Sequence, residues 1–112
     1  MSEIAQLNAA RRIVLGDAKL YPQIVEGILP IIGANARLEL RRWGAEFLAE
    51  TFASPAVSSQ IKESMSVLVL QLLKDLLDVP GEDVEVIKAV VQAAASIYGL
   101  IFRYMYVCPG SC

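Results

Sequence analysis

Residues 37–52 read RLELRRWGAEFLAETF, and this stretch decides the fold class. Its apolar residues recur every three or four positions, which places them on one face of a helix: Leu40, Trp43, Phe47, Leu48 and Thr51. Charged residues fall on the opposite face: Glu39, Arg42, Glu46 and Glu50. The spacing therefore predicts an amphipathic helix that buries one side and exposes the other.

The same pattern returns with an offset of 46 residues, from Leu40 to Val86 and from Arg42 to Lys88. Glu46 and Leu48 likewise return as Gln92 and Ala94. Each of these segments follows another helical stretch, 21–32 in the first case and 58–79 in the second. Paired helices repeating in this range of lengths are typical of HEAT and armadillo solenoids, which stack their units and hold other proteins on the resulting surface.

Five helices are expected in all, over residues 2–15, 21–32, 37–52, 58–79 and 83–104, and no stretch has the pattern of a strand. The Tyr21-Pro22 pair suits a first helical turn, Ser58 or Ser59 can cap the fourth helix, and Asp83 can cap the fifth. We therefore predict an all-α solenoid in which a leading helix precedes two helix-pair repeats.

The last two helices carry wide apolar faces. The fourth should be covered on more than one side, because its apolar residues span a wide arc: Ile61, Met65, Leu68, Val69, Leu72, Leu73, Leu76 and Leu77. The core stripe of the fifth comprises Val86, Val90, Ala94, Ile97, Tyr98, Ile101 and Phe102. Because the end of a solenoid needs a polar face, we expect these helices to be the start of a longer solenoid. If the unit stands alone, we expect it to self-associate through the last helix.

Composition excludes several classes of function. A net charge of −2 and a pI of about 5.0 argue against direct nucleic-acid binding. The longest uncharged run, over residues 89–102, is well short of the roughly 20 residues of a membrane span, and no signal peptide is evident, so an intracellular location is expected. Cys108 and Cys112 lie in a C-terminal tail, predicted to be unstructured over residues 106–112, and without any histidine they do not suggest a metal site.

Catalytic signatures are also missing. No histidine supplies a general base, the serines lack a neighbouring base, and no glycine-rich phosphate loop occurs. Glu82, Asp83 and Glu85 open a helix, where its dipole favours negative charge. We expect no enzyme activity, no cofactor and no metal.

The densest basic patch is formed by Arg37, Arg41 and Arg42, which could contact RNA or a phosphorylated peptide or could simply be a solvated helix face. The matching register of Arg42 and Lys88 favours the second interpretation, and Trp43 is interpreted as a core residue. The repeat register also aligns two polar rows, which are candidates for partner binding or ordinary solvated surface: Arg42, Glu46 and Glu50 with Lys88, Gln92 and Ser96.

Three stretches carry a family resemblance: YPQIVEGILPII over residues 21–32, LELRRWGAEFLAE over 38–50, and VIKAVVQAAASIY over 86–98. They resemble the N-terminal region of symplekin, in its fungal branch, over roughly residues 3–105. The resemblance implies that residues 1–105 are a HEAT-repeat segment of a nuclear, non-catalytic scaffold in pre-mRNA cleavage and polyadenylation. It also implies docking of 3′-end processing proteins, among them a phosphatase of the RNA polymerase II C-terminal domain.

The sequence departs from that family in length, because symplekins are long, and no contact residue is carried over. Two alternatives stay open. One is a HEAT-type adaptor in another pathway, such as transport or phosphatase regulation. The other is a small helical enzyme or ligand carrier with a pocket between helices, against which the missing histidines and the lack of convergent polar residues argue.

Overall fold

The computed structural model describes residues 3–106, with side chains described up to Gly99. This part of the chain consists of helices and loops without any strand, which confirms the predicted all-α class. The α-helices are α1 (Glu3–Gly16), α2 (Tyr21–Ile28), α3 (Leu38–Ala53), α4 (Pro55–Ser58), α5 (Glu63–Leu77) and α6 (Val84–Tyr106). Two short 3₁₀ turns flank α2, namely η1 (Ala18–Leu20) and η2 (Leu29–Ile31).

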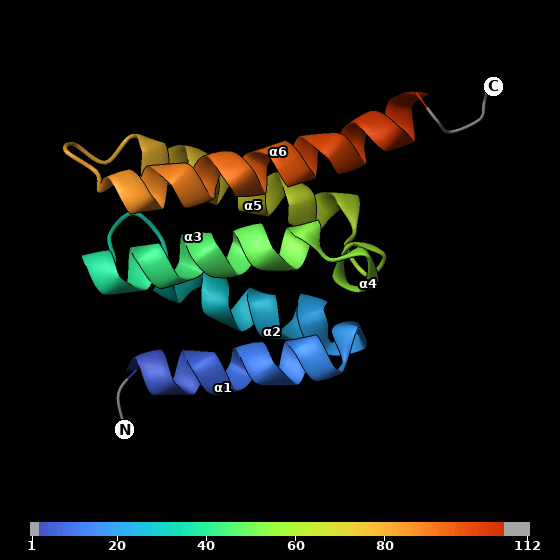
Figure 1. Ribbon diagram of the computed structural model, residues 1–112, viewed down its shortest axis with the longest axis horizontal. Helices are drawn as coiled ribbons and strands as arrows, with labels where there is room; N and C mark the ends of the chain where they lie inside the picture. The colour runs from blue at the N-terminus through green and yellow to red at the C-terminus, as the bar shows by residue number, and fades with distance from the viewer. Residues whose placement is uncertain (1–2, 107–112) are drawn as a thin grey trace.

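The helices form two layers. Figure 1 shows α1, α3 and α6 side by side and running in the same direction, with α2 and α5 behind them. The molecule measures 49 × 32 × 19 Å, and its shortest dimension suits two layers because packed helices lie about 8–10 Å apart. Helix α3 is central, since it contacts α1 on one flank and α6 on the other.

Local sequence signals account for most helix ends. Pro22 lies in the first turn of α2, where its missing N–H costs no hydrogen bond, and Pro30 lies in the 3₁₀ turn that ends the helix. Asp83 caps α6 as predicted, because its Oδ1 accepts a hydrogen bond of 2.8 Å from the backbone N–H of Glu85. Gly81 adopts a φ of 67° in the preceding turn, a conformation that glycine tolerates best.

The helix predicted over residues 58–79 is α5, which begins only at Glu63, so its predicted start is wrong; Ser58 belongs to the separate short helix α4. The hydroxyl groups of Ser58 and Ser59 donate hydrogen bonds back to the carbonyls of Pro55 and Ala56 and favour an end to α4 there. The N-cap of α5 is Lys62, whose side chain makes no capping hydrogen bond. Neither serine therefore caps the long helix.

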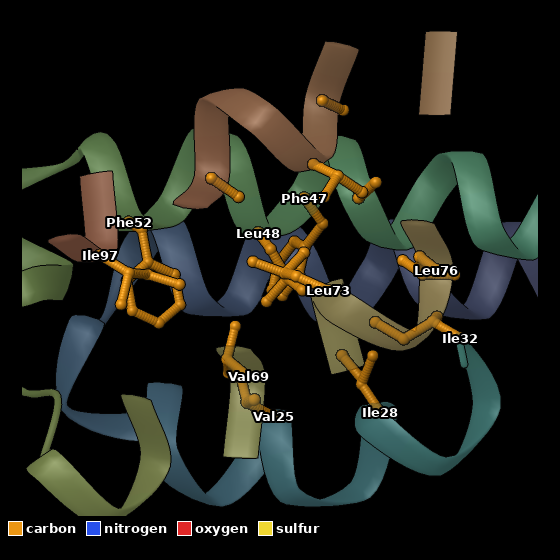
Figure 2. Close-up of a cluster of buried hydrophobic side chains, with 14 of the residues drawn as sticks. Val25, Ile28, Ile32, Phe47, Leu48, Phe52, Val69, Leu73, Leu76 and Ile97 are labelled. Carbon is orange, nitrogen blue, oxygen red and sulfur yellow. The ribbon is translucent and has the colours of Figure 1, made fainter. Parts of the chain in front are cut away.

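One hydrophobic core runs between the two layers, as Figure 2 shows in close-up. Every helix from α2 to α6 except the short α4 contributes to the labelled cluster, which consists of Val25, Ile28, Ile32, Phe47, Leu48, Phe52, Val69, Leu73, Leu76 and Ile97. The Tyr21 hydroxyl lies in this core, 2.9 Å from the Thr51 hydroxyl, which donates in turn to the carbonyl of Phe47. This chain of hydrogen bonds satisfies polar groups that burial would otherwise penalise.

Gly44 allows α3 to approach η2 closely. A Cβ added at this position would lie 2.5 Å from the Cβ of Ile32, a distance at which the backbone must shift. Ile32 itself is fully buried, so it has little room to move away. Glycine is therefore required here by packing between α3 and the end of the α2 segment.

Several residues predicted to lie in the core are exposed. The exposed fractions are 56% for Leu68, 49% for Leu77 and 60% for Tyr98. Within the described residues, α5 packs against α6 and contributes to the core shared with α2 and α3, but part of its wide apolar arc stays exposed. Trp43 is only partly buried, at the edge of the core, while the side chains of Ile101 and Phe102 lie outside the described residues.

Candidate functional site

The start of α3 and the start of α6 are joined by ion pairs. Arg41 donates two hydrogen bonds of 2.9 Å, from Nε and Nη2, to the carboxylate of Glu82, and its Nη1 donates at 2.6 Å to the carbonyl of Ala36. The two side chains are 15% and 2% exposed, so this bidentate pair lies largely out of solvent. Next to it, Arg42 Nη2 lies 3.2 Å from Asp83 Oδ2.

These contacts shift the titration of the groups involved. The hydrogen bonds from Arg41 lower the pKa of the Glu82 carboxyl, and those to Glu82 raise the pKa of Arg41. The pKa of Asp83 is lowered first by the backbone N–H of Glu85 and further by Arg42. Both carboxylates therefore stay ionised at neutral pH and balance the two arginines.

The basic patch is thus paired with carboxylates. Arg37, its third member, lies 2.7 Å from Glu3. An RNA backbone or a phosphorylated peptide would have to displace these carboxylates to bind the arginines. The structure accordingly favours the interpretation of the patch as a structural link between helices.

The α3 row of predicted partner-binding residues lies on the exposed side of the central helix. Arg42 is held by Asp83, and Glu50 accepts hydrogen bonds of 2.6 and 2.8 Å from Nη2 of Arg11 on α1. Glu46 is exposed between them and has no ion pair within the described residues. Of this row, Glu46 is therefore the side chain that can bind a partner protein without breaking an ion pair within the described residues.

A shallow hollow of about 210 Å³ lies beside Glu46, between α1 and α3. Its lining residues are Asn8, Arg11, Trp43, Glu46, Phe47 and Glu50. The indole of Trp43 stacks on Phe47 with ring centroids 4.9 Å apart, and its N–H donates to Asn8 Oδ1 at 2.8 Å. The tryptophan therefore fixes α1 against α3 and forms part of the hollow at the same time.

The α6 row continues on the neighbouring helix. Lys88 is exposed and lies 4.0 Å from Glu85, Gln92 is exposed, and Ser96 is half-buried. Since α3 and α6 pack together and run in parallel, the two rows lie on adjacent helices, as their register predicted. Within the described residues, Glu46 and Gln92 are the side chains of the combined set without a polar partner, and the others are engaged in ion pairs or partly covered.

Within the described residues, no group of three or more histidine, cysteine or acidic side chains could hold a metal ion. Cys108 and Cys112, with the predicted tail after Tyr106, lie outside those residues. Among the described helices, none combines the length and hydropathy that crossing a bilayer requires. A groove of about 840 Å³ runs between the end of the α2 segment and α5, and it is open to solvent.

Sequence reasoning did not identify the contacts that join neighbouring helices. The pairs Arg41–Glu82, Arg11–Glu50 and Trp43–Asn8 connect residues 35 to 41 positions apart, beyond the reach of any local pattern. One signal was present for the first pair, because Glu82 and Asp83 directly precede α6 while Arg41 and Arg42 lie in the first turn and a half of α3.

Comparison with known proteins gave one relative. The chain is 32% identical over 106 residues to the mRNA cleavage and polyadenylation specificity factor complex subunit pta1 of Schizosaccharomyces pombe. The match covers 95% of this chain but 15% of that subunit, so the chain spans less than a sixth of the length of its relative. No family model and no solved structure matches the sequence.

Proposed function

We propose that this chain is a non-catalytic, protein-binding module in nuclear mRNA 3′-end processing. The observation that carries the proposal is the 32% identity to the polyadenylation subunit along 95% of the chain. A match over nearly every helix, rather than over one motif, is what shared packing and shared surfaces produce. The proposal therefore concerns the segment as a whole and the assembly to which it belongs.

The architecture supports a HEAT-type scaffold. Helices α1, α3 and α6 lie in one layer with α2 and α5 behind, and the 46-residue offset relates α3 to α6. Arginines, carboxylates and Trp43 join neighbouring helices, so the conspicuous polar side chains hold the stack together. A stack of this kind presents a rigid surface, which is how repeat proteins bind partners.

The partner surface in this proposal is the face of α3 and α6 that bears the two polar rows. Glu46 and Gln92 lie at its centre with their side chains free, and Arg42, Glu50, Lys88 and Ser96 surround them. The partner would be another 3′-end processing protein. The phosphatase of the RNA polymerase II C-terminal domain is the partner that the symplekin resemblance implies.

Affinity capture from a fission yeast nuclear extract tests the proposal. The purified chain is immobilised, and the bound proteins are identified by mass spectrometry. We expect polyadenylation factors in the bound fraction. The double variant Glu46→Lys and Gln92→Lys should bind them with an affinity lower by at least roughly tenfold, about 1.4 kcal/mol.

The matched control is Glu26→Lys with Gln23→Lys, two exposed residues on α2 in the other layer. It makes the same change of charge away from the proposed surface, so its capture should equal that of the parent. Equal loss in both double variants would point to net charge as the cause. Absence of polyadenylation factors from every bound fraction would contradict the proposed role and favour an adaptor in another pathway.

A further inference from the structure

The hollow between α1 and α3 contains one unpaired carboxylate. Its lining residues come from both helices: Asn8, Arg11, Trp43, Glu46, Phe47 and Glu50. Arg11 is already neutralised by Glu50, which accepts hydrogen bonds of 2.6 and 2.8 Å from its Nη2. Glu46 makes no ion pair within the described residues, so the charged side chains that line the hollow leave one negative charge unbalanced.

The nearest arginine along α3 is engaged on the other side of the helix. Arg42 lies one turn before Glu46, but its Nη2 lies 3.2 Å from Asp83 Oδ2 at the start of α6. Arg42 is also not among the residues that line the hollow. The charge of Glu46 can therefore pair with a cation from outside the chain without breaking this contact.

The aromatic wall of the hollow is fixed in place. Phe47 is 2% exposed, and its ring stacks on the indole of Trp43 with a centroid distance of 4.9 Å. The indole N–H donates to Asn8 Oδ1 at 2.8 Å, so residues of two helices hold the tryptophan. Because this wall is already ordered, little conformational freedom is lost when another group packs against it.

The size and chemistry of the hollow suit one arginine side chain. Its volume of about 210 Å³ lies below the roughly 300–1,000 Å³ of small-molecule sites. A flat guanidinium forms two hydrogen bonds with one carboxylate and packs on aromatic rings, whereas the ammonium of lysine acts as a point charge. The chain itself forms this bidentate pair twice, between Arg11 and Glu50 and between Arg41 and Glu82.

We propose that the hollow receives an arginine side chain of a partner protein. The guanidinium forms two hydrogen bonds with the carboxylate of Glu46, and the methylene stem packs against the aromatic wall of Trp43 and Phe47. This inference rests on the proposed function and deepens it, because it states that the protein bound to the α3–α6 face presents an exposed arginine. The hollow fixes that partner at the α1 edge of the face.

Binding of a single arginine tests the proposal. Trp43 is the one tryptophan of the chain and lines the hollow, so its indole N–H gives a single NMR signal that reports on this site. N-acetyl-arginine amide is titrated into the purified chain, and we expect a saturable shift of that signal. N-acetyl-citrulline amide has nearly the same shape without the charge, and it should bind roughly fivefold more weakly because one exposed ion pair is lost.

Glu46→Gln removes the charge from the hollow and keeps the size of the side chain. Because Glu46 is exposed, the variant should unfold at the same urea midpoint as the parent. Its affinity for the arginine probe should fall roughly fivefold, to that of the citrulline probe. Glu39→Gln is the matched control, since Glu39 is an exposed carboxylate of α3 that does not line the hollow, and its affinity should equal that of the parent.

Three results would overturn the proposal: no saturable shift of the indole signal, equal affinity for the arginine and citrulline probes, or equal affinity of the parent and Glu46→Gln for arginine. The capture experiment separates this inference from the proposed function. Capture of polyadenylation factors by a chain that does not bind the arginine probe would overturn the inference alone. Arginine binding without any captured polyadenylation factor would contradict the role in mRNA processing and still support the assignment of the hollow.

Discussion

Helices α3 and α6 share a register but differ in what surrounds them. Ala45 and Phe52 of α3 are 0% and 3% exposed, whereas Val91 and Tyr98, their equivalents on α6, are 57% and 60% exposed. The side chains are of the same kind in both helices. The comparison teaches that sequence periodicity decides which flank of a helix is apolar, and the neighbouring helices decide whether that flank is buried.

The two helices also differ in the polar contacts that join them to neighbouring helices. Polar contacts join α3 to both neighbours, with Arg41 reaching the start of α6 and Glu50 and Trp43 reaching α1. Within the described side chains, α6 has such links on its α3 flank alone. Substitutions at the α3 contacts should therefore lower the free energy of unfolding by an amount that increases with the burial of each contact.

The largest effect is expected at Glu82. Glu82→Ala leaves the guanidinium of Arg41 largely buried without its carboxylate, and we expect a loss of about 3–4 kcal/mol in the free energy of unfolding. Urea denaturation followed by circular dichroism measures it. Glu85→Ala, an exposed carboxylate three residues away, should cost under about 1 kcal/mol, and a similar loss in both variants would show that burial is not the cause.

A smaller effect is expected at Gly44. Alanine is normally the better helix former by about 1 kcal/mol, but its Cβ would collide with Ile32, so Gly44→Ala should lose about 2 kcal/mol net. Gly27→Ala is the control, because a Cβ there meets no atom within 4 Å, and it should stabilise the fold. A Gly44→Ala variant as stable as the parent would contradict the close approach of α3 to η2.

The link between α3 and α6 should also weaken in acid. The pKa of Glu82 is lower in the folded chain than its ordinary value of 4.5, because Arg41 stabilises the carboxylate. The pair thus contributes its full stability above that ordinary value and loses it as the pH falls through the lower, folded pKa. Urea midpoints between pH 7 and pH 3 should therefore decline less in Glu82→Gln than in the parent, and parallel curves would contradict this linkage.

The smallest effect is expected at the α1 flank. The pair of Arg11 and Glu50 has the same bidentate chemistry as that of Arg41 and Glu82, but both side chains are more than one third exposed. Glu50→Ala should therefore cost only about 0.5 kcal/mol, and less at high salt. A cost equal to that of Glu82→Ala would mean that this flank is also covered in solution.

The sequence predicted the helices whose apolar residues recur with a clear period and whose ends carry proline, glycine or a capping residue. Prolines and glycines marked the ends of α2 and α5, and Asp83 marked the start of α6. The break between α4 and α5 was not predicted, because the buried residues Val57, Ile61, Met65 and Val69 keep a four-residue spacing straight through it. A periodic pattern cannot reveal a turn that preserves the period.

The candidate surface could be predicted only in part. Register alone placed Glu46 and Gln92 on adjacent helices, but whether a partner binds them stays a prediction. The ion pairs across helices depend on the tertiary arrangement, which the spacing of Arg41 and Glu82 along the chain does not encode. The exposure of Leu68, Leu77 and Tyr98 likewise depends on which helices are present to cover them.

Exchange of the matched segment in fission yeast tests the central claim most directly. The 106-residue stretch of the pta1 subunit that aligns with this chain is replaced by the corresponding residues of this chain, and assembly of the subunit into its complex is measured by affinity purification. If the chain is a functional equivalent, the chimera should enter the complex at the level of the unaltered subunit and support growth. A chimera that accumulates as a folded protein yet stays outside the complex would contradict the proposed role.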